Sequence, residues 1–338
     1  MNTTLATDKK APGVVDPGRA RILLGEGWRA ADLHCHTLHS YDVIPTRHVD
    51  PIALYDRARQ LGMSFVAFTD HDTMAAYDEV GWTREGLVPA VEVKILDLRN
   101  VGHTIHVNVY TLDRRQFRTI QGIAGRARDI LALTSYLRTE GLPFSFNHPF
   151  WHEPDEKLNL RAVIDVAPLF PVLEYNMGRV GRINAQALRL ADSLSKGVVA
   201  GTDSHVGEIG RAFTLARGDS FKEFFDSVIA RESYLCSTDL TLPRFKAETA
   251  LRIRHLFDKT AWLRPKDSLS IDTGNAILDR IVRRVARDGS ESPKLSHRLL
   301  RGAIEAVSST GIPGSLYIRY QNNLADQIGR MLEAGGAA

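Results

Sequence analysis

The fold of this chain is decided by residues 29–36, which read RAADLHCH. This run ends in His34 and His36, which lie two positions apart and therefore project from one face of an extended strand. Acidic or imidazole side chains recur in or just after later apolar runs, at Asp42, His71, Glu92, His106, His148, Asp203 and His205. Nine such residues are too many for one ion and suit two or three. Because imidazole nitrogen and carboxylate oxygen are ligands of Zn, Mn and Fe(II), the pattern predicts a multimetal hydrolase.

Strand-like and helix-like segments alternate along the chain up to about residue 203. Seven strands are predicted, at residues 29–36, 64–70, 88–95, 104–112, 143–147, 171–176 and 198–203. Helical patterns lie between several of them, at 51–61, 117–139 and 183–194. This alternation predicts an α/β fold with a largely parallel sheet and barrel-like closure, in which function collects at the C-terminal ends of the strands. The candidate ligands fall in or just after these strands.

The chain is predicted to have three parts. Residues 1–26 are expected to form a flexible N-terminal tail, residues 27–242 a metal-dependent hydrolase barrel, and residues 243–338 a helical C-terminal extension. Helices are predicted in the extension at 247–257, 275–287, 295–307 and 317–332. Every candidate ligand precedes residue 206. The extension is therefore expected to tune substrate choice or association without supplying the metal chemistry.

The composition is that of an ordinary soluble protein, with 43% hydrophobic and 25% charged residues. No apolar run reaches the ~18 residues of a membrane span, so no membrane association is expected. Residues 1–18 lack the apolar core of a signal peptide. Two cysteines argue against a disulfide framework, and a cytoplasmic location is the expectation.

A basic stripe in the predicted helix 275–287 is the feature that points to nucleic acid. Its arginines follow i, i+3, i+4, i+7 spacing, at Arg280, Arg283, Arg284 and Arg287. The opposite stripe is apolar, formed by Leu278, Ile281, Val282 and Val285. An ordinary amphipathic surface helix is therefore the favoured interpretation, and the net charge of +3 requires no nucleic-acid partner.

Glu92 lies between Val91 and Val93 in an otherwise apolar strand. An unpaired carboxylate there would be costly to bury, and bound cations would relieve that cost. The alternative is a buried ion pair with Lys94, which shares the strand face of Glu92. A lone His-x-His is weak evidence for a metal, but its combination with the other histidines, Asp203 and Glu92 favours a metal site.

The series of motifs resembles the polymerase-and-histidinol-phosphatase (PHP) superfamily of metal-dependent phosphoesterases. The matching segments are Asp32 to Thr37 with Ser40 to Asp42, Thr69 to His71, Pro89 to Glu92, the apolar-flanked His106, Asn147 to Pro149 and Gly201 to His205, in family order. The resemblance covers about residues 30–210 and implies a distorted (β/α)7 barrel of PHP type, to which the helical extension is an appendage. It also implies two or three divalent ions (Zn, Mn or Fe), held by the nine candidates with Glu92 as the bridge.

The resemblance implies hydrolysis of a phosphoester, either a small-molecule phosphomonoester or a nucleotide, by a hydroxide that bridges two ions. Glu92, Asp203 and His205 are expected to be catalytic. Asp42 follows His36 by six residues where many members have five, so a loop cap is its alternative role. The competing functions are amidohydrolase-like hydrolysis of a non-phosphate bond and a nuclease activity.

Arginine suits phosphate oxygens because its planar fork matches them. Arg179 and Arg182 follow the strand at 171–176, and Arg211 follows His205, so these three are the candidate substrate-binding residues, with solvated surface as the alternative. His39 and His152 flank ligand motifs and are candidates to protonate a leaving group, or else surface histidines.

Four further residues flank the motifs. Asp70 and Asp72 are candidates to orient a metal-bound imidazole, with helix N-capping as the alternative for Asp72. Cys35 is expected to pack on the opposite strand face from the histidines. Trp151 is expected either to wall a substrate pocket or to pack in the core.

Overall fold

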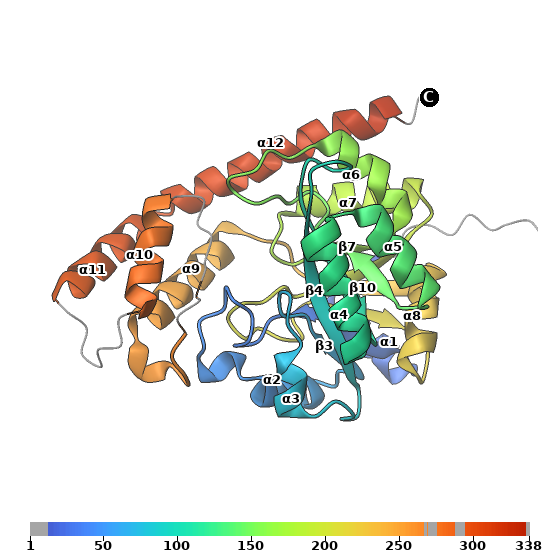
Figure 1. The fold of residues 1–338 in the computed structure, drawn as a ribbon, viewed down its shortest axis with the longest axis horizontal. Helices are drawn as coiled ribbons and strands as arrows, with labels where there is room; N and C mark the ends of the chain where they lie inside the picture. Colours follow the sequence, from blue (N-terminus) through green and yellow to red (C-terminus); the bar gives the residue numbers. More distant parts are fainter. Residues whose placement is uncertain (1–12, 267–268, 270–275, 288–294, 336–338) are drawn as a thin grey trace, which may run out of the picture.

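The computed structural model describes residues 13–266, Leu269, 276–287 and 295–335 (Figure 1). Its strands are β1 (Gly13–Val15), β2 (Arg29–Cys35), β3 (Phe65–Phe68), β4 (Leu87–Asp97), β5 (His103–Tyr110), β6 (Phe144–Phe146), β7 (Val172–Asn176), β8 (Gly197–Gly201), β9 (Phe213–Ala216) and β10 (Ser233–Cys236). Its helices are α1 (Pro17–Gly25), α2 (Pro51–Gln60), α3 (Ala75–Val80), α4 (Arg114–Gly122), α5 (Ile130–Thr139), α6 (Leu160–Val166), α7 (Gly181–Ser193), α8 (Phe221–Ile229), α9 (Leu242–Phe257), α10 (Ala276–Arg287), α11 (Leu295–Ser309) and α12 (Ile312–Gly335).

The strands form one mixed sheet in the order β1-β10-β9-β2-β3-β4-β5-β6-β7-β8. All seven predicted strands are present, as β2 to β8, which confirms the α/β class. The expectation of a largely parallel sheet is wrong at β5, which runs antiparallel to both β4 and β6. The physical reason is the connection at residues 98–102, which is too short for a crossover and forms a hairpin. Asp97 stabilises this turn by accepting the backbone N–H groups of Arg99 and Asn100.

The sheet curls until the segment after β8 meets β2, which gives the distorted barrel. Ser204 forms a parallel bridge with Cys35, and its carbonyl accepts the N–H of His36 at 3.2 Å. The N–H of Asp203 donates to the carbonyl of His34 at 2.7 Å. The first and last ligand segments are therefore neighbours across this junction.

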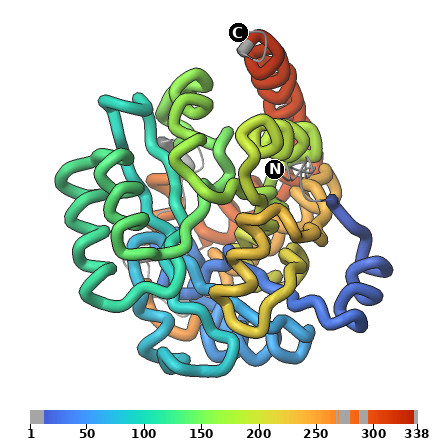
Figure 2. Tube along the Cα trace, turned by 90° about the vertical axis from the view of Figure 1, so that its right-hand side faces the viewer, coloured from blue at the N-terminus to red at the C-terminus, as the bar shows by residue number. Residues whose placement is uncertain are grey.

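The N-terminal segment differs from the predicted flexible tail. Residues 1–12 lie outside the described residues, but residues 13–25 form β1 and α1. β1 pairs in parallel with β10, and α1 lies beside β9 (Figure 2). Asp16 caps α1 by accepting the N–H groups of Gly18 and Arg19, and the buried Leu23 anchors the helix. Because the partners are β9 and β10, which lie far away in the sequence, local patterning does not reveal this structure.

The helices predicted between strands are present, with one interruption. Residues 117–139, predicted as one helix, form α4 and α5 with a π turn at Ile123–Ala127 between them. Arg128 adopts a left-handed backbone conformation with φ 52°, and the Asp129 side chain then caps α5. Two glycines, Gly122 and Gly125, lower the helix propensity at the break. Within the described ranges, no helix combines the length and apolarity needed to cross a membrane.

The four helices predicted in the C-terminal extension are present as α9 to α12. α12 crosses the barrel beside α7, and α9, α10 and α11 form a group at one end of the molecule (Figure 1). Arg182 of α7 pairs with Asp326 of α12, and the N–H of Val180 donates to Gln321 at 3.0 Å. Ile253, Phe257 and Val285 pack with Ile44 of the barrel in a small separate core. These contacts join the extension to the barrel at α7 and at Ile44.

Candidate metal centre

The fold brings all nine candidate ligands into one buried cluster. β2 and the residue after it supply His34 and His36, and β4 and β5 supply Glu92 and His106 from within the strands. The others come from the segments after strands, which contribute Asp42, His71, His148, Asp203 and His205. The carboxyl ends of the strands therefore provide most of the cluster. The antiparallel β5 provides His106 from its middle instead.

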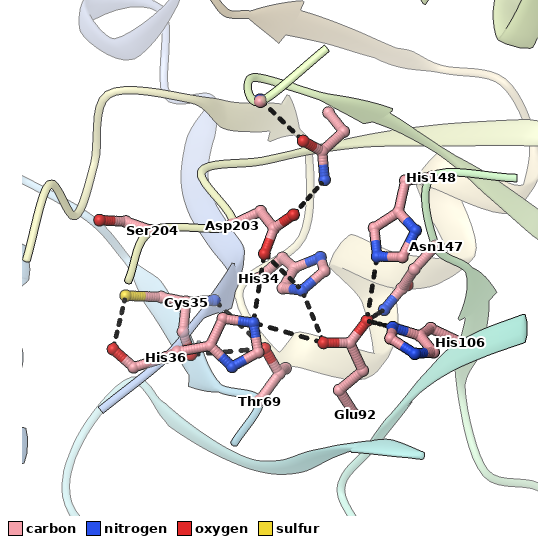
Figure 3. Close-up of polar contacts among 12 residues, drawn as sticks. His34, Cys35, His36, Thr69, Glu92, His106, Asn147, His148, Asp203 and Ser204 are labelled. Carbon is pink, nitrogen blue, oxygen red and sulfur yellow. Dashed lines mark hydrogen bonds and ion pairs between the residues drawn. The ribbon is translucent and has the colours of Figure 1, made fainter. Parts of the chain in front are cut away.

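Glu92 lies at the centre of the cluster, and its side chain is fully buried (Figure 3). Its Oε2 atom lies 3.1 Å from Nε2 of His34 and 3.3 Å from Nε2 of His36. Its Oε1 atom lies 3.1 Å from Nδ1 of His106 and 3.2 Å from Nε2 of His148. Glu92 and His106 share one sheet face because β4 and β5 pair in antiparallel register, with Glu92 opposite Asn108 and Lys94 opposite His106.

The alternative of a buried Glu92–Lys94 pair is wrong. Lys94 pairs with Glu153 at the edge of the cluster. Burial alone would raise the pKa of Glu92, but the nearby rings of His34, His71 and His106 hold it well below its usual range. Glu92 is therefore an ionised carboxylate whose neighbours are imidazoles.

Asp203 and His34 link the two ends of the ligand series. Oδ1 of Asp203 lies 3.2 Å from Nε2 of His36 and 3.4 Å from Nε2 of His34. Its other oxygen accepts from Nδ2 of Asn176 at 3.0 Å. Asp203 has a left-handed backbone with φ 49°, and His148 has φ 25°, both rare for residues with a side chain. Strain of this kind concentrates at functional sites because the surrounding structure has to hold it in place.

Asp42 joins the cluster despite its longer spacing from His36. Its Oδ2 atom lies 2.8 Å from Nε2 of His205 and 3.5 Å from Nε2 of His71. Oγ of Ser40 donates to its Oδ1 at 2.7 Å. Asp42 is therefore more than a cap of its own loop.

The buried carboxylates of the cluster shift the pKa values of the histidines beside them. Burial opposes protonation of His34, yet Glu174, Glu92 and Asp203 raise its pKa well above the usual value. Burial likewise opposes protonation of His36, but Asp203 and Glu92 raise its pKa to about 10. His106 behaves oppositely, because burial outweighs Glu92 and lowers its pKa to about 3. The carboxylates thus favour positive charge on the groups beside them.

The donor atoms of the cluster fit divalent cations. Among the described residues, four groups of three or four nitrogen and oxygen donors have all their atoms within 4.8 Å of one another. The groups are His36, Asp42, His71 and His205; His34, His36 and Glu92; His34, His148 and Asp203; and His71, Glu92 and His106. Nδ1 of His36 and Nε2 of His106 are buried without a hydrogen-bond partner in the described structure. Mixed imidazole and carboxylate donors suit Zn, Mn and Fe(II).

A second carboxylate, Glu174 of β7, supports the cluster and is absent from the sequence prediction. Its Oε1 lies 2.6 Å from Nδ1 of His34, and its Oε2 accepts the N–H of His148 at 2.8 Å. Asn147 donates to Glu92 at 2.8 Å. Glu174 carries the same sequence signal as Glu92, a lone acid in an apolar strand between Leu173 and Tyr175.

The two aspartates beside His71 have roles other than the expected ones. Asp70 accepts the N–H and the hydroxyl of Thr37, each at 2.6 Å. Asp72 accepts the N–H of Lys94 at 3.3 Å and the amide of Gln121 at 3.1 Å. Both therefore hold backbone segments rather than imidazole rings, and Asp72 does not cap α3. Cys35 is buried and packs in the core as expected.

A cavity of about 470 Å³ opens beside the cluster. Of the three predicted substrate-binding arginines, Arg179 lines this cavity and the other two do not. Arg182 pairs with Asp326 and Arg211 with Glu208, and each side chain is 58% exposed. Their short spacing from the ligand strands carries no information on which way a helical or loop side chain points. Trp151 lines the cavity, in contact with the rings of His106 and His148, so its predicted role as a pocket wall is consistent with this position.

The extension supplies part of the cavity wall, which the sequence did not indicate. Its lining residues are Arg244, Phe245, Glu248, Thr249 and Arg252 of α9 and Tyr317 of α12. His39 and His152, the predicted proton donors, are not among the described lining residues. His39 contacts Glu79 and Arg264, and His152 contacts Tyr320 at 2.8 Å. Packing of the extension against the barrel therefore determines which of its residues line the cavity. It also determines the contacts that His39 and His152 make with Arg264 and Tyr320.

The curled α/β sheet surrounds a buried cluster of imidazole and carboxylate donors that could hold metal ions. A family model described as PHP-associated matches residues 181–233, a segment that includes Asp203 and His205. No curated protein matches the chain. The motifs, their convergence in the fold and this family match agree in resembling the PHP superfamily.

Solved structures from three organisms resemble the chain at low identity. A two-domain protein from Bacteroides vulgatus containing a PHP-like metal-dependent phosphoesterase has a TM-score of 0.48 and 16% identity, over 72% of this chain and 74% of its own. A metal-dependent phosphoesterase from Bifidobacterium adolescentis has a TM-score of 0.41 and 17% identity, over 62% and 97%. A lesion-specific endonuclease from Pyrococcus furiosus has a TM-score of 0.41 and 13% identity, over 62% and 57%. Likeness at this distance does not indicate a substrate.

Proposed function

We propose that the protein hydrolyses a phosphoester of a small molecule, with two or three divalent ions held by the nine clustered residues. The observation that carries this proposal is the buried carboxylate of Glu92, which has imidazole nitrogens within 3.4 Å on both of its oxygens. Such a carboxylate between imidazoles is suited to bridge two cations. When bound, divalent ions acidify water and neutralise charge that develops on phosphoryl oxygens.

The protein's own side chains would orient the ligands. Glu174 accepts from Nδ1 of His34, which fixes the ring tautomer and leaves Nε2 free to face Glu92. Asn176 holds one oxygen of Asp203 and so turns the other toward His34 and His36. In this proposal Glu92, Asp203 and His205 are the catalytic ligands, because β4 and the segment after β8 bring them together in the cluster.

Arg179 is the proposed contact for the anionic substrate. Its guanidinium lies over the ring of Trp151 at 5.8 Å and donates to the hydroxyl of Tyr317 at 2.9 Å. No carboxylate pairs with it among the described residues, in contrast to Arg244 and Arg252 nearby. A cation without a paired anion, one indole ring away from the cluster, is suited to bind phosphate oxygens.

The size of the cavity favours a small substrate over nucleic acid. A volume of about 470 Å³ falls in the range of small-molecule pockets. In the basic helix α10, Arg280, Arg283 and Arg284 are exposed while Val282 and Val285 are buried in the extension. The side chain of Arg287 lies outside the described residues. This is the pattern of an amphipathic surface helix, and a nuclease remains the less favoured alternative.

The two cysteines are buried and unpaired, which supports the proposed cytoplasmic location. The walls from α9 and α12 support the proposed role of the extension in substrate choice. The extension contributes no residue to the four donor groups of the described structure.

A substrate panel tests the proposed reaction. Phosphomonoesters, phosphodiesters, nucleotides, single-stranded DNA, amides and lactones would be assayed with protein loaded with Zn²⁺, Mn²⁺ or Fe²⁺. We expect turnover of small phosphoesters, lost on chelation and restored by metal. Turnover of amides or lactones alone would support the amidohydrolase alternative and reject the phosphoesterase proposal, and cleavage restricted to DNA would support the nuclease.

A further inference from the structure

A lysine of the extension reaches the loop that carries Asp42. Nζ of Lys266 donates to the carbonyls of Leu38 at 3.1 Å and Val43 at 2.8 Å, and also to that of Ser40. An ammonium has three donors and no acceptor, so three carbonyls satisfy it fully. The contact spans more than 220 residues of sequence.

The residues just before Lys266 also contact this loop. Trp262 forms an antiparallel bridge with Thr46, and the N–H of Leu263 donates to the carbonyl of Pro45 at 2.8 Å. Arg264 lies 2.9 Å from Nδ1 of His39. Residues 262–266 therefore follow the loop from one end to the other, and we name them the clamp segment.

The clamped loop has little structure of its own. Residues 37–45 form turns rather than a helix or strand, and the backbone bonds within them run from Ser40 to Thr37 at 3.1 Å and from Val43 to Ser40 at 3.2 Å. Yet this loop has to hold Asp42 against His205 and His71. Ser40 couples the backbone to the cluster, since its hydroxyl donates to Asp42 and accepts the N–H of His71 at 3.3 Å.

We propose that Lys266 is a positioning residue for the metal centre, which fixes the loop so that Asp42 completes the donor group with His36, His71 and His205. This role rests on the proposed function, because it requires Asp42 to be a metal ligand. The extension thereby contributes to metal binding without supplying a ligand. The competing explanation is that Lys266 only anchors the extension to the barrel.

Zn²⁺ binding distinguishes the two explanations. Wild type, Lys266→Met, Lys266→Gln, Asp42→Asn and Lys246→Met would be stripped of metal and titrated with Zn²⁺ against a chelator of known affinity, with thermal unfolding followed in parallel. Lys246 is the matched control, because its Nζ donates to the carbonyl of Ser309 inside the extension and touches no part of the loop. Altering a residue that orients a metal ligand typically weakens metal binding by about 10–100-fold.

We expect Lys266→Met to weaken one class of Zn²⁺ site by at least about tenfold, in the same direction as Asp42→Asn, and to leave the other sites unchanged. Lys266→Gln, which keeps two N–H donors, should have an intermediate effect and provides the test if the methionine variant does not fold. Lys246→Met should bind Zn²⁺ like wild type.

Two results would overturn the role of Lys266. If Asp42→Asn weakens Zn²⁺ binding but folded Lys266→Met and Lys266→Gln bind like wild type, Lys266 is only an anchor and the proposed function stands. If Asp42→Asn itself binds like wild type, the assignment of Asp42 in the proposed function fails together with the role of Lys266.

Discussion

Replacing Glu92 by glutamine is the most direct perturbation of the proposed centre. The substitution keeps the shape of the side chain but removes its charge, at a carboxylate with five imidazole nitrogens at 3.1–3.4 Å. A hydrogen bond to a charged group contributes about 1.5–3 kcal/mol of net free energy. If the substitution removes the charge from two such contacts of Glu92, transition-state stabilisation falls by on the order of 4 kcal/mol. This loss corresponds to about a thousandfold in rate.

We therefore expect Glu92→Gln to remain folded and to lose about a thousandfold in kcat/KM on a small phosphomonoester. Bound metal per chain should fall as well. The assay compares steady-state kinetics and elemental analysis of wild type, Glu92→Gln and Glu140→Gln. Glu140 is the control because it is a partly exposed glutamate that pairs with Arg115 on the barrel surface. A folded, fully metal-loaded Glu92→Gln enzyme with near-normal turnover would refute the bridging role.

Three further predictions concern the surroundings of the centre. Glu174→Gln should weaken metal binding by about 10–100-fold while the protein stays folded, measured by chelator competition; unchanged affinity would contradict its role in orienting His34. Arg179→Met should raise KM for a phosphoester by about tenfold or more with a smaller effect on metal content, whereas Arg182→Met, outside the cavity, should behave like wild type; equal effects of the two would reject the assignment. In the metal-free protein, Asp203 and Glu92 outweigh burial and raise the pKa of His36 from 6.5 to about 10. Protonation of His36 therefore stabilises the fold fully below pH 6.5, and this stabilisation is lost as the pH rises through about 10. Bound metal requires neutral imidazole, so the metal-loaded protein should instead lose stability as pH falls, and parallel pH slopes of unfolding for the two forms would be inconsistent with the site.

Much of the fold was accessible from the sequence because its signals are local. The seven central strands are short apolar runs, and each candidate ligand lies in or beside one of them. The end of a strand can be predicted without knowing which strand lies beside it. Because the carboxyl ends of barrel strands meet at one end of the barrel, His34 and His205 are expected to converge. Glu174 also has a local sequence signal, because it is a lone acidic residue between Leu173 and Tyr175 in an apolar strand.

The remainder depends on partners far away in the chain. β1 has only three residues and gains its hydrogen bonds from β10, so no periodicity reveals it. The antiparallel direction of β5 depends on the length of one turn. The directions of Arg179 and Arg182 differ because Arg182 meets Asp326 of α12 while Arg179 meets Tyr317. Lys266 likewise gains a role only once the extension has packed against the barrel.

The junction between β2 and the segment after β8 has a consequence for folding. Asp203 and His34 are joined by a backbone hydrogen bond and also face each other as side chains, so the edge that closes the barrel runs through the middle of the ligand cluster. Closing a loop of roughly 170 residues costs about 4.5 kcal/mol of chain entropy, more than a single hydrogen bond returns. Cations held at this junction would hold β2 and the segment after β8 together. Chelation should then open the junction first, and amide hydrogen exchange at His36 and Asp203 should accelerate while β4 and β5 stay protected.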